Sequence, residues 1–290
     1  MITGATGGLG NAVVKALLAK EPDAAIHILV RNPEQDSVTA LAAANVTVDK
    51  GSYDDYESLL QAFKGIDVLY FVSGNDVANR MPQHENVVNA AKAAGVQHIL
   101  YTSTVRNDES ATAPLYPVVS SHVQTENLIK ASGMKYTFLR HNLYAEVIPM
   151  FLGAQVAETK TIYLPAGAGK TAFVARTDFA AAGANILADA AVHENKIYEL
   201  NGTERLSFEE IGTIIATAIG APVQYTSPEV TDYIHTMKAA GLPEEIAGML
   251  SMFGQAIAAE EFNQQSDDLV QLLGRAPQSI NTFIQQVYSK

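Results

Sequence analysis

The chain opens on a glycine-rich turn, TGATGGLG (residues 3–10), in which glycine recurs at every third position. Gly4 can adopt the positive φ angle of a tight turn, Gly7 lets a phosphate group approach the backbone, and Gly10 lets a helix pack closely against a sheet. A helical pattern follows, and the free N–H groups at the start of a helix bind phosphates. The spacing is not G-x-G-x-x-G, so it predicts dinucleotide binding only where a strand precedes the turn and βα units follow it. The predicted contacts with the dinucleotide are Gly4, Thr6, Gly7, Gly8, Leu9 and Gly10.

Strand-like and helix-like segments alternate after the turn. Short apolar runs predict strands at 26–30, 46–48, 67–72, 98–103 and 136–140. Helical patterns lie between them at 36–44, 56–63, 85–95 and 123–132. This alternation predicts an α/β fold: a Rossmann-type, doubly wound parallel sheet with helices on both faces. Only three residues precede Gly4, so either the first strand is unusually short or the natural chain starts a few residues earlier, and the sequence leaves both open.

The alternation breaks after about residue 142. We expect two parts: an NAD(P)-binding domain at 1–142, and a smaller, mainly helical, substrate-binding part at 143–290. The second part is not expected to fold independently, and its chain can cross back to the sheet. Ligand would bind in the cleft between the parts. The segment PAGAGK (165–170) lacks the spacing of a phosphate loop and suits a hairpin turn between short strands.

Composition narrows the classes of function. The net charge of −12 over 290 residues argues against nucleic acid as a partner, because phosphate binding needs clustered Lys and Arg. With no cysteine there is no disulfide, thiolate nucleophile or Cys-ligated metal, and the sequence shows no other cluster of metal ligands. No apolar run is long enough to span a membrane, and no signal peptide is visible. We therefore expect a cytoplasmic protein without a metal.

Arg31 stands where the cofactor is selected. The second predicted strand ends in ILVRNPE, and NAD-specific folds place an Asp or Glu near this point to bind the ribose 2′-hydroxyl. A guanidinium instead suits a 2′-phosphate through charge-assisted, often bidentate hydrogen bonds. The sequence thus predicts NADPH as the preferred cofactor, with NADH use left open. The alternative is a solvated arginine at a strand end.

Several segments together resemble one protein family. TGATGGLG, VRNPE, HENVVNAAKAAGVQHILYTS and YTFLRHNLY are similar to the NmrA-like branch of the atypical short-chain dehydrogenases, and within it to type-2 NAD(P)H:quinone oxidoreductases and triphenylmethane reductases. The resemblance covers nearly the whole chain. It implies NADPH without flavin, a substrate pocket between the two parts, and hydride transfer to a quinone or similar planar electrophile.

A gap in this resemblance bears on the chemistry. Sugar-modifying relatives use Tyr-x-x-x-Lys on a helix, whose i, i+4 spacing places both side chains on one face. Counted back from Glu126, this sequence has Val118 and His122 at those positions. A reaction that needs a tyrosinate base is therefore disfavoured, including that of a nucleoside-diphosphate-sugar epimerase. The remaining alternative is a redox sensor that binds NAD(P) without turnover and regulates a protein partner.

The resemblance implies three catalytic residues. His122 would hold a ribose hydroxyl or act as an acid near neutral pH. Ser103, at the end of a predicted strand, would lie near the nicotinamide, as would Tyr144. Each residue also has a purely structural alternative. His122 could be a helix histidine bonded to a local carbonyl, Ser103 a cap at the end of its strand, and Tyr144 a packed core tyrosine.

The resemblance also implies further cofactor contacts. Ser73 and Gly74 would line the ribose and phosphate path, and Asn142 would face the nicotinamide or the substrate. Ser52 replaces an Asp that in many relatives contacts the adenine amine, so we expect looser adenine recognition that relies on stacking by Arg31. The expected partner is a quinone-like small molecule, with a homo-oligomer or a regulatory protein left open.

Overall fold

A parallel sheet forms the centre of the protein. The computed structural model describes residues 1–44, 46–153 and 156–289. In spatial order the described strands of the sheet are β2 (Thr47–Lys50), β1 (His27–Val30), β3 (Val68–Phe71), β4 (His98–Thr104), β5 (Lys135–His141) and β8 (Lys196–Leu200). Every pairing between neighbours is parallel. From the gap between β1 and β3, successive strands are added outwards on one side as β1 and β2, and on the other side as β3, β4, β5 and β8. This gap is the topological switch point of a doubly wound fold.

The N-terminal segment fills the space between β1 and β3. Ile2 forms parallel bridges with Ile28 and with Tyr70. Its backbone N–H donates to His27, and its carbonyl accepts from Leu29. Residues 1–3 thus act as the first strand of the Rossmann unit and lead directly into the glycine turn.

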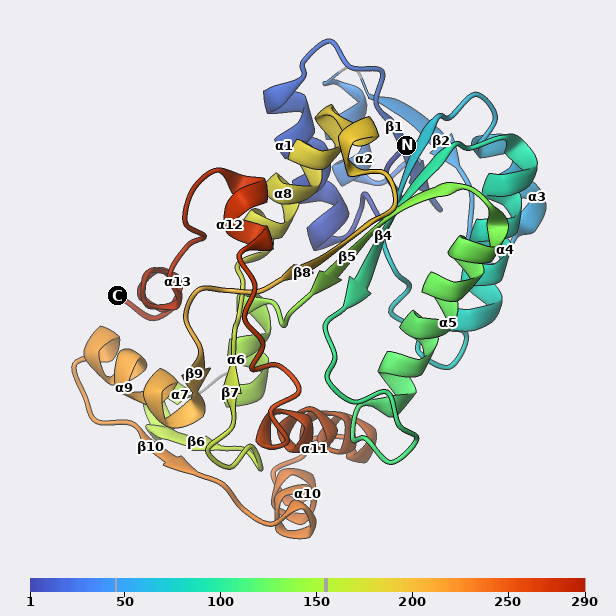
Figure 1. Cartoon of the computed structure of the whole chain (residues 1–290). Coiled ribbons are helices and arrows are strands. Elements are labelled where there is room, and N and C mark those ends of the chain that lie inside the picture. The colour runs from blue at the N-terminus through green and yellow to red at the C-terminus, as the bar shows by residue number, and fades with distance from the viewer. Residues whose placement is uncertain (45, 154–155, 290) are drawn as a thin grey trace.

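Helices cover both faces of the sheet (Figure 1). One face carries α1 (Gly8–Lys20), α2 (Asp36–Ala42), α8 (Arg176–Ala188) and α12 (Asp268–Leu273). The other carries α3 (Tyr56–Ala62), α4 (Arg80–Ala94) and α5 (Tyr116–Ser132). Because both faces are covered, the central strands are largely buried, and six of the seven residues of β4 are buried. The predicted α/β, doubly wound fold is confirmed. α5 begins seven residues before the predicted start at 123, with Pro117 in its first turn.

The C-terminal part has its own core and lies at one end of the sheet (Figure 1). Its helices are α6 (Ile148–Leu152), α7 (Val156–Thr159), α9 (Phe208–Ile219), α10 (Val230–Ala239), α11 (Glu244–Ala258) and α13 (Ile280–Tyr288), with the 3₁₀ turn η1 (Ala145–Val147) at its start. Its strands are β6 (Thr161–Tyr163), β7 (Lys170–Thr171), β9 (Leu206–Ser207) and β10 (Gln224–Thr226). A second 3₁₀ turn, η2 (Ala190–His193), leads into β8.

The chain crosses back to the sheet after residue 142. α8, β8 and α12 belong to the layers of the nucleotide-binding unit although they follow that residue in sequence. Each of the two parts is therefore not one continuous stretch of sequence, and the domain boundary at residue 142 stays a proposal. None of the helices in the described ranges is long and apolar enough to cross a membrane.

The hairpin predicted at PAGAGK is wrong. β6 pairs with β10 and β7 pairs with β9, so the two strands that flank the segment do not pair with each other. The segment instead packs onto α11: a Cβ on Gly169 would lie 1.9 Å from the Ile257 carbonyl oxygen. Glycine is needed there for close backbone contact, which a sequence pattern alone does not distinguish from a turn.

Candidate cofactor-binding and active site

A cavity of about 560 Å³ lies at the carboxyl ends of the central strands, beside the start of α1. Its volume falls in the range of small-molecule sites, and its place at the switch point is where doubly wound folds bind ligands. The six turn residues predicted as contacts all line it. The other predicted residues that line it are Arg31, Ser52, Ser73, Gly74 and Tyr144.

The glycine turn has the geometry of a phosphate-binding loop. Gly4 has φ +61°, which a side chain would strain. A Cβ on Gly10 would lie 2.3 Å from the Gly4 carbonyl oxygen, so only glycine lets α1 approach the first strand this closely. Gly7 has an ordinary φ of −88°, and a Cβ there would lie 3.2 Å from the same oxygen, a close contact that a small backbone shift could relieve. The first N–H groups of α1 have no intrahelical partner and are available to an anion.

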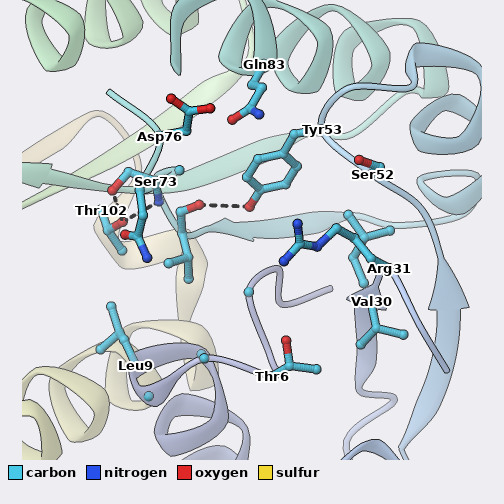
Figure 2. Close-up of a pocket in the computed structure, with 18 of the residues that line it drawn as sticks. Thr6, Leu9, Val30, Arg31, Ser52, Tyr53, Ser73, Asp76, Gln83 and Thr102 are labelled. Carbon is cyan, nitrogen blue, oxygen red and sulfur yellow. Dashed lines mark hydrogen bonds between the residues drawn. The ribbon is translucent and has the colours of Figure 1, made fainter. Parts of the chain in front are cut away.

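Arg31 and Ser52 form one wall of the cavity, at the ends of β1 and β2. Figure 2 shows the Arg31 guanidinium pointing into the space between Tyr53 and Thr6. No residue in the described parts of the chain gives Arg31 a hydrogen bond or an ion pair, so its charge is available to a ligand. The Ser52 hydroxyl donates to Asp54 Oδ2 at 3.2 Å and accepts from the Asp54 N–H at 3.3 Å. With its proton directed to Asp54, the Ser52 hydroxyl keeps a lone pair that can accept from a ligand.

Tyr53 and Thr102 stiffen the floor of the cavity. The Tyr53 hydroxyl donates to the Val72 carbonyl at 2.8 Å and is also hydrogen-bonded to Thr3 (Figure 2). The Thr102 hydroxyl accepts from the N–H of Ser73 at 2.9 Å. Burial raises the pKa of Tyr53, so its phenol stays protonated and serves as a structural hydrogen-bonding group.

Tyr144 lines the cavity with its ring. Its hydroxyl is hydrogen-bonded to Nδ1 of His141 at 3.1 Å, and burial raises the pKa of the phenol. The Arg176 guanidinium lies 5.5 Å from the ring centroid, in a cation–π arrangement. A Cβ on Gly8 would come within 2.7 Å of the same guanidinium, so Arg176 lies against the first turn of α1. Arg176 lines the cavity and was not predicted; the only sequence signal was a cation at the start of a helix, in VARTDFA.

Three predicted residues do not line this cavity. Asn142 donates to Asn201 Oδ1 at 2.7 Å and to the Phe262 carbonyl at 3.0 Å, which ties the end of β5 to the C-terminal part. Ser103 donates its hydroxyl proton to Glu126 Oε1 at 2.7 Å. These bonds occupy the groups that the sequence assigned to ligands, and the assignments of both residues to the site stay predictions.

The third is His122, which is 5% exposed and hydrogen-bonded through Nδ1 to the Tyr101 hydroxyl at 2.7 Å. Burial, helped by the charge of Arg80, lowers the pKa of His122 well below its usual 6.5. The imidazole is therefore neutral, and its environment does not favour an acid that works near neutral pH. A role in holding a ribose hydroxyl stays a prediction.

Comparison with known proteins places this geometry in a family. The sequence profile of the NmrA-like family matches residues 1–284. The chain belongs to the NmrA-like family. Quinone oxidoreductase 2 of Escherichia coli is 34% identical over 289 residues, which cover 99% of this NmrA-like chain and 98% of that protein. The predicted resemblance is thus confirmed.

Solved structures agree with the sequence comparison. The structure of the NADPH-dependent quinone oxidoreductase of Escherichia coli in complex with NADPH superposes with a TM-score of 0.89 at 34% identity and covers 99% of both chains. Triphenylmethane reductase from Citrobacter sp. also gives a TM-score of 0.89 at 34% identity, with 99% of this chain and 98% of that one covered. No group of three or more potential metal-ligating residues occurs in the described parts of the chain.

Proposed function

We propose that this protein is an NADPH-dependent reductase that transfers hydride to a quinone or a similar planar electrophile. One observation carries the proposal: a glycine turn at the start of a helix, and an arginine that has no partner among the described residues, line the same cavity at the switch point. Two similar proteins support it, since they are named as a quinone oxidoreductase and a triphenylmethane reductase.

The residues around the cavity fit NADPH. The N–H groups of Gly8 and Leu9, in the first turn of α1, would bind the pyrophosphate, because the Gly7 N–H already donates to the Gly4 carbonyl at 2.9 Å. The absence of a side chain at Gly7 leaves the approach of the pyrophosphate open. Arg31 would bind the 2′-phosphate, because its guanidinium has no partner in the described residues and reaches into the cavity. In this arrangement the Ser52 hydroxyl would accept a hydrogen bond from the adenine amine. Arg176, against Gly8, adds a second positive charge beside the phosphates. When bound, NADPH supplies the hydride.

The groups near the cavity suit an electrophile that needs no protein base. Val118 and His122 replace the tyrosine and lysine of a proton relay, and His122 is buried and neutral. The Tyr144 phenol has a raised pKa and is bonded to His141, so no phenolate is available there. A quinone reduced by hydride can take its proton from water. The contribution of this chain is then to orient the cofactor and to present a rigid aromatic wall to it.

A purified sample tests the proposal directly. We expect NADPH to bind more tightly than NADH, and 1,4-benzoquinone to be reduced with NADPH without added flavin or metal. Binding of NADPH without oxidation by any quinone or aldehyde in a panel would favour the redox-sensor alternative. A cytoplasmic location is part of the same proposal, because NADPH is a cofactor of the cell interior. Self-association and a regulatory protein partner stay predictions.

A further inference from the structure

One glycine in the cavity wall has both its backbone N–H and its backbone carbonyl bonded by side chains that lie behind the wall. Gly74 lines the cavity in the segment that follows β3. Its N–H donates to Nε2 of His84 at 3.0 Å, and its carbonyl accepts from Nε of Arg80 at 2.8 Å. Both side chains come from α4, and neither lines the cavity. Helix α4 thereby fixes the orientation of a backbone segment that faces the ligand.

The histidine of this pair has a defined hydrogen-bonding direction. Because the Gly74 N–H is a donor, Nε2 of His84 must be the acceptor, and the ring proton resides on Nδ1. That proton is donated to the Thr125 hydroxyl at 2.8 Å, and Thr125 donates to the Ser121 carbonyl at 2.8 Å. His84 is 0% exposed, and burial followed by the charge of Arg80 lowers its pKa to about 3. The ring therefore stays neutral and keeps its acceptor towards Gly74.

The arginine of the pair is buried, and the carboxylate that favours its charge, Asp76, lies beyond ion-pair distance. Arg80 is 6% exposed, and its other hydrogen bond goes to the Ser121 hydroxyl at 3.0 Å. Across the described residues no carboxylate lies within ion-pair distance of it. Burial nevertheless lowers the pKa of Arg80, so Asp76 compensates its charge only in part, and further negative charge nearby would be favourable. The phosphates of a dinucleotide bound on the other side of the Gly74 segment would supply opposite charge.

We propose that Arg80 and His84 are positioning residues for the cofactor: together they hold the Gly74 peptide in its cofactor-binding orientation, and the charge of Arg80 favours the anionic ligand. The inference rests on the proposed NADPH site. It differs from a purely structural role, in which the same two residues would only pack α4 against α5. The two roles predict different effects on NADPH and on the fold.

The experiment compares variants by NADPH titration, by steady-state kinetics with 1,4-benzoquinone, and by thermal unfolding with and without NADPH. Arg80→Met and His84→Leu should each raise the Kd and the KM for NADPH roughly tenfold, the effect of losing one strong hydrogen bond. The KM for 1,4-benzoquinone and kcat should change less than twofold. The rise in Tm that NADPH causes should shrink, most of all in Arg80→Met.

Matched variants separate positioning from packing. Ser121→Ala removes the bond between Arg80 and α5 but leaves the bonds to Gly74, so it should keep the wild-type KM for NADPH. Arg80→Lys keeps the charge and His84→Gln keeps an acceptor, so each should restore part of the NADPH affinity. These conservative variants also carry the test if Arg80→Met or His84→Leu fails to fold.

Two outcomes would overturn the inference while the proposed function stands. One is an unchanged KM for NADPH in folded Arg80→Met and His84→Leu, or in both conservative variants. The other is a rise in Ser121→Ala as large as in Arg80→Met, which would assign the pair to helix packing. If the wild type itself does not bind NADPH, the proposed function fails first and the inference fails with it.

Discussion

Replacing Arg31 should change cofactor choice without changing the fold. The Arg31 side chain makes no hydrogen bond or ion pair within the described residues, so its substitution should move the free energy of unfolding by less than about 0.5 kcal/mol. Charge-assisted hydrogen bonds to the 2′-phosphate are worth about 1.5–3 kcal/mol. At about 1.4 kcal/mol per tenfold, Arg31→Gln should weaken NADPH binding by roughly one to two orders of magnitude. NADH lacks that phosphate, so it should lose much less affinity, namely the part that adenine stacking on Arg31 contributes.

Arg31→Glu adds repulsion to this loss. Two like charges about 4 Å apart in water repel by about 1 kcal/mol, a further factor of about five against NADPH. The new carboxylate can also accept from the ribose 2′-hydroxyl, so NADH should bind better than NADPH in this variant. Fluorescence titration of both cofactors gives the Kd values. A repeat at higher salt should reduce the wild-type preference, because the site is exposed. NADPH affinity within twofold of wild type in both variants would refute the assignment of Arg31.

Further predictions concern other residues of the site and of the core. Gly7→Val should abolish NADPH binding, because its side chain occupies the approach of the pyrophosphate. Its Cβ would also lie 3.2 Å from the Gly4 carbonyl oxygen, so thermal unfolding is measured to confirm that the variant is folded, and unaltered titration would exclude the phosphate-loop interpretation. Reduced nicotinamide hypoxanthine dinucleotide phosphate has a carbonyl in place of the adenine amine, so it should bind roughly tenfold more weakly than NADPH. The Ser52→Ala variant should show little difference between the two cofactors. Equal affinity of the wild type for both would contradict the acceptor role of Ser52. His122→Ala should lower kcat by at most about tenfold, and a complete loss of turnover would make His122 an essential proton donor. Burial raises the pKa of Glu126, but hydrogen bonds from two arginines outweigh this effect and hold the pKa at about 2, below the usual 4.5. The contribution of the ionised Glu126 to folding stability is therefore present above pH 4.5 and is lost as the pH falls towards 2. Urea unfolding of the wild type and of Glu126→Gln over that pH range measures this contribution.

Local pattern was sufficient to predict the sheet and one end of the site. Each of the features used for the prediction is local, because it spans only a few residues. These features are the glycine spacing, the short apolar runs and the position of Arg31 directly after a buried strand. In a doubly wound fold the carboxyl ends of the strands meet at one edge. The residues that follow those strands, including Ser52 and Ser73, therefore lie together in the cavity.

The direction of side chains at the strand ends was not predictable in the same way. Ser103 and Thr102 are neighbours on β4 and point to opposite faces, so only Thr102 reaches the cavity. Asn142 is held by the Phe262 carbonyl, and Arg176 reaches Gly8 from α8. Each of these contacts joins distant parts of the chain and depends on how α8 and the C-terminal part return to the sheet. No local periodicity encodes that return.

The most direct test of the central claim is a single-turnover experiment with wild-type protein. Protein in excess over NADPH is mixed anaerobically with 1,4-benzoquinone, without flavin or metal, and NADPH absorbance and hydroquinone formation are followed together. The account predicts that each NADPH lost yields one hydroquinone, at a rate that follows the fraction of cofactor bound. Tight NADPH binding with no loss of its absorbance, for this quinone and for related planar electrophiles, would contradict the claim that the protein is a reductase.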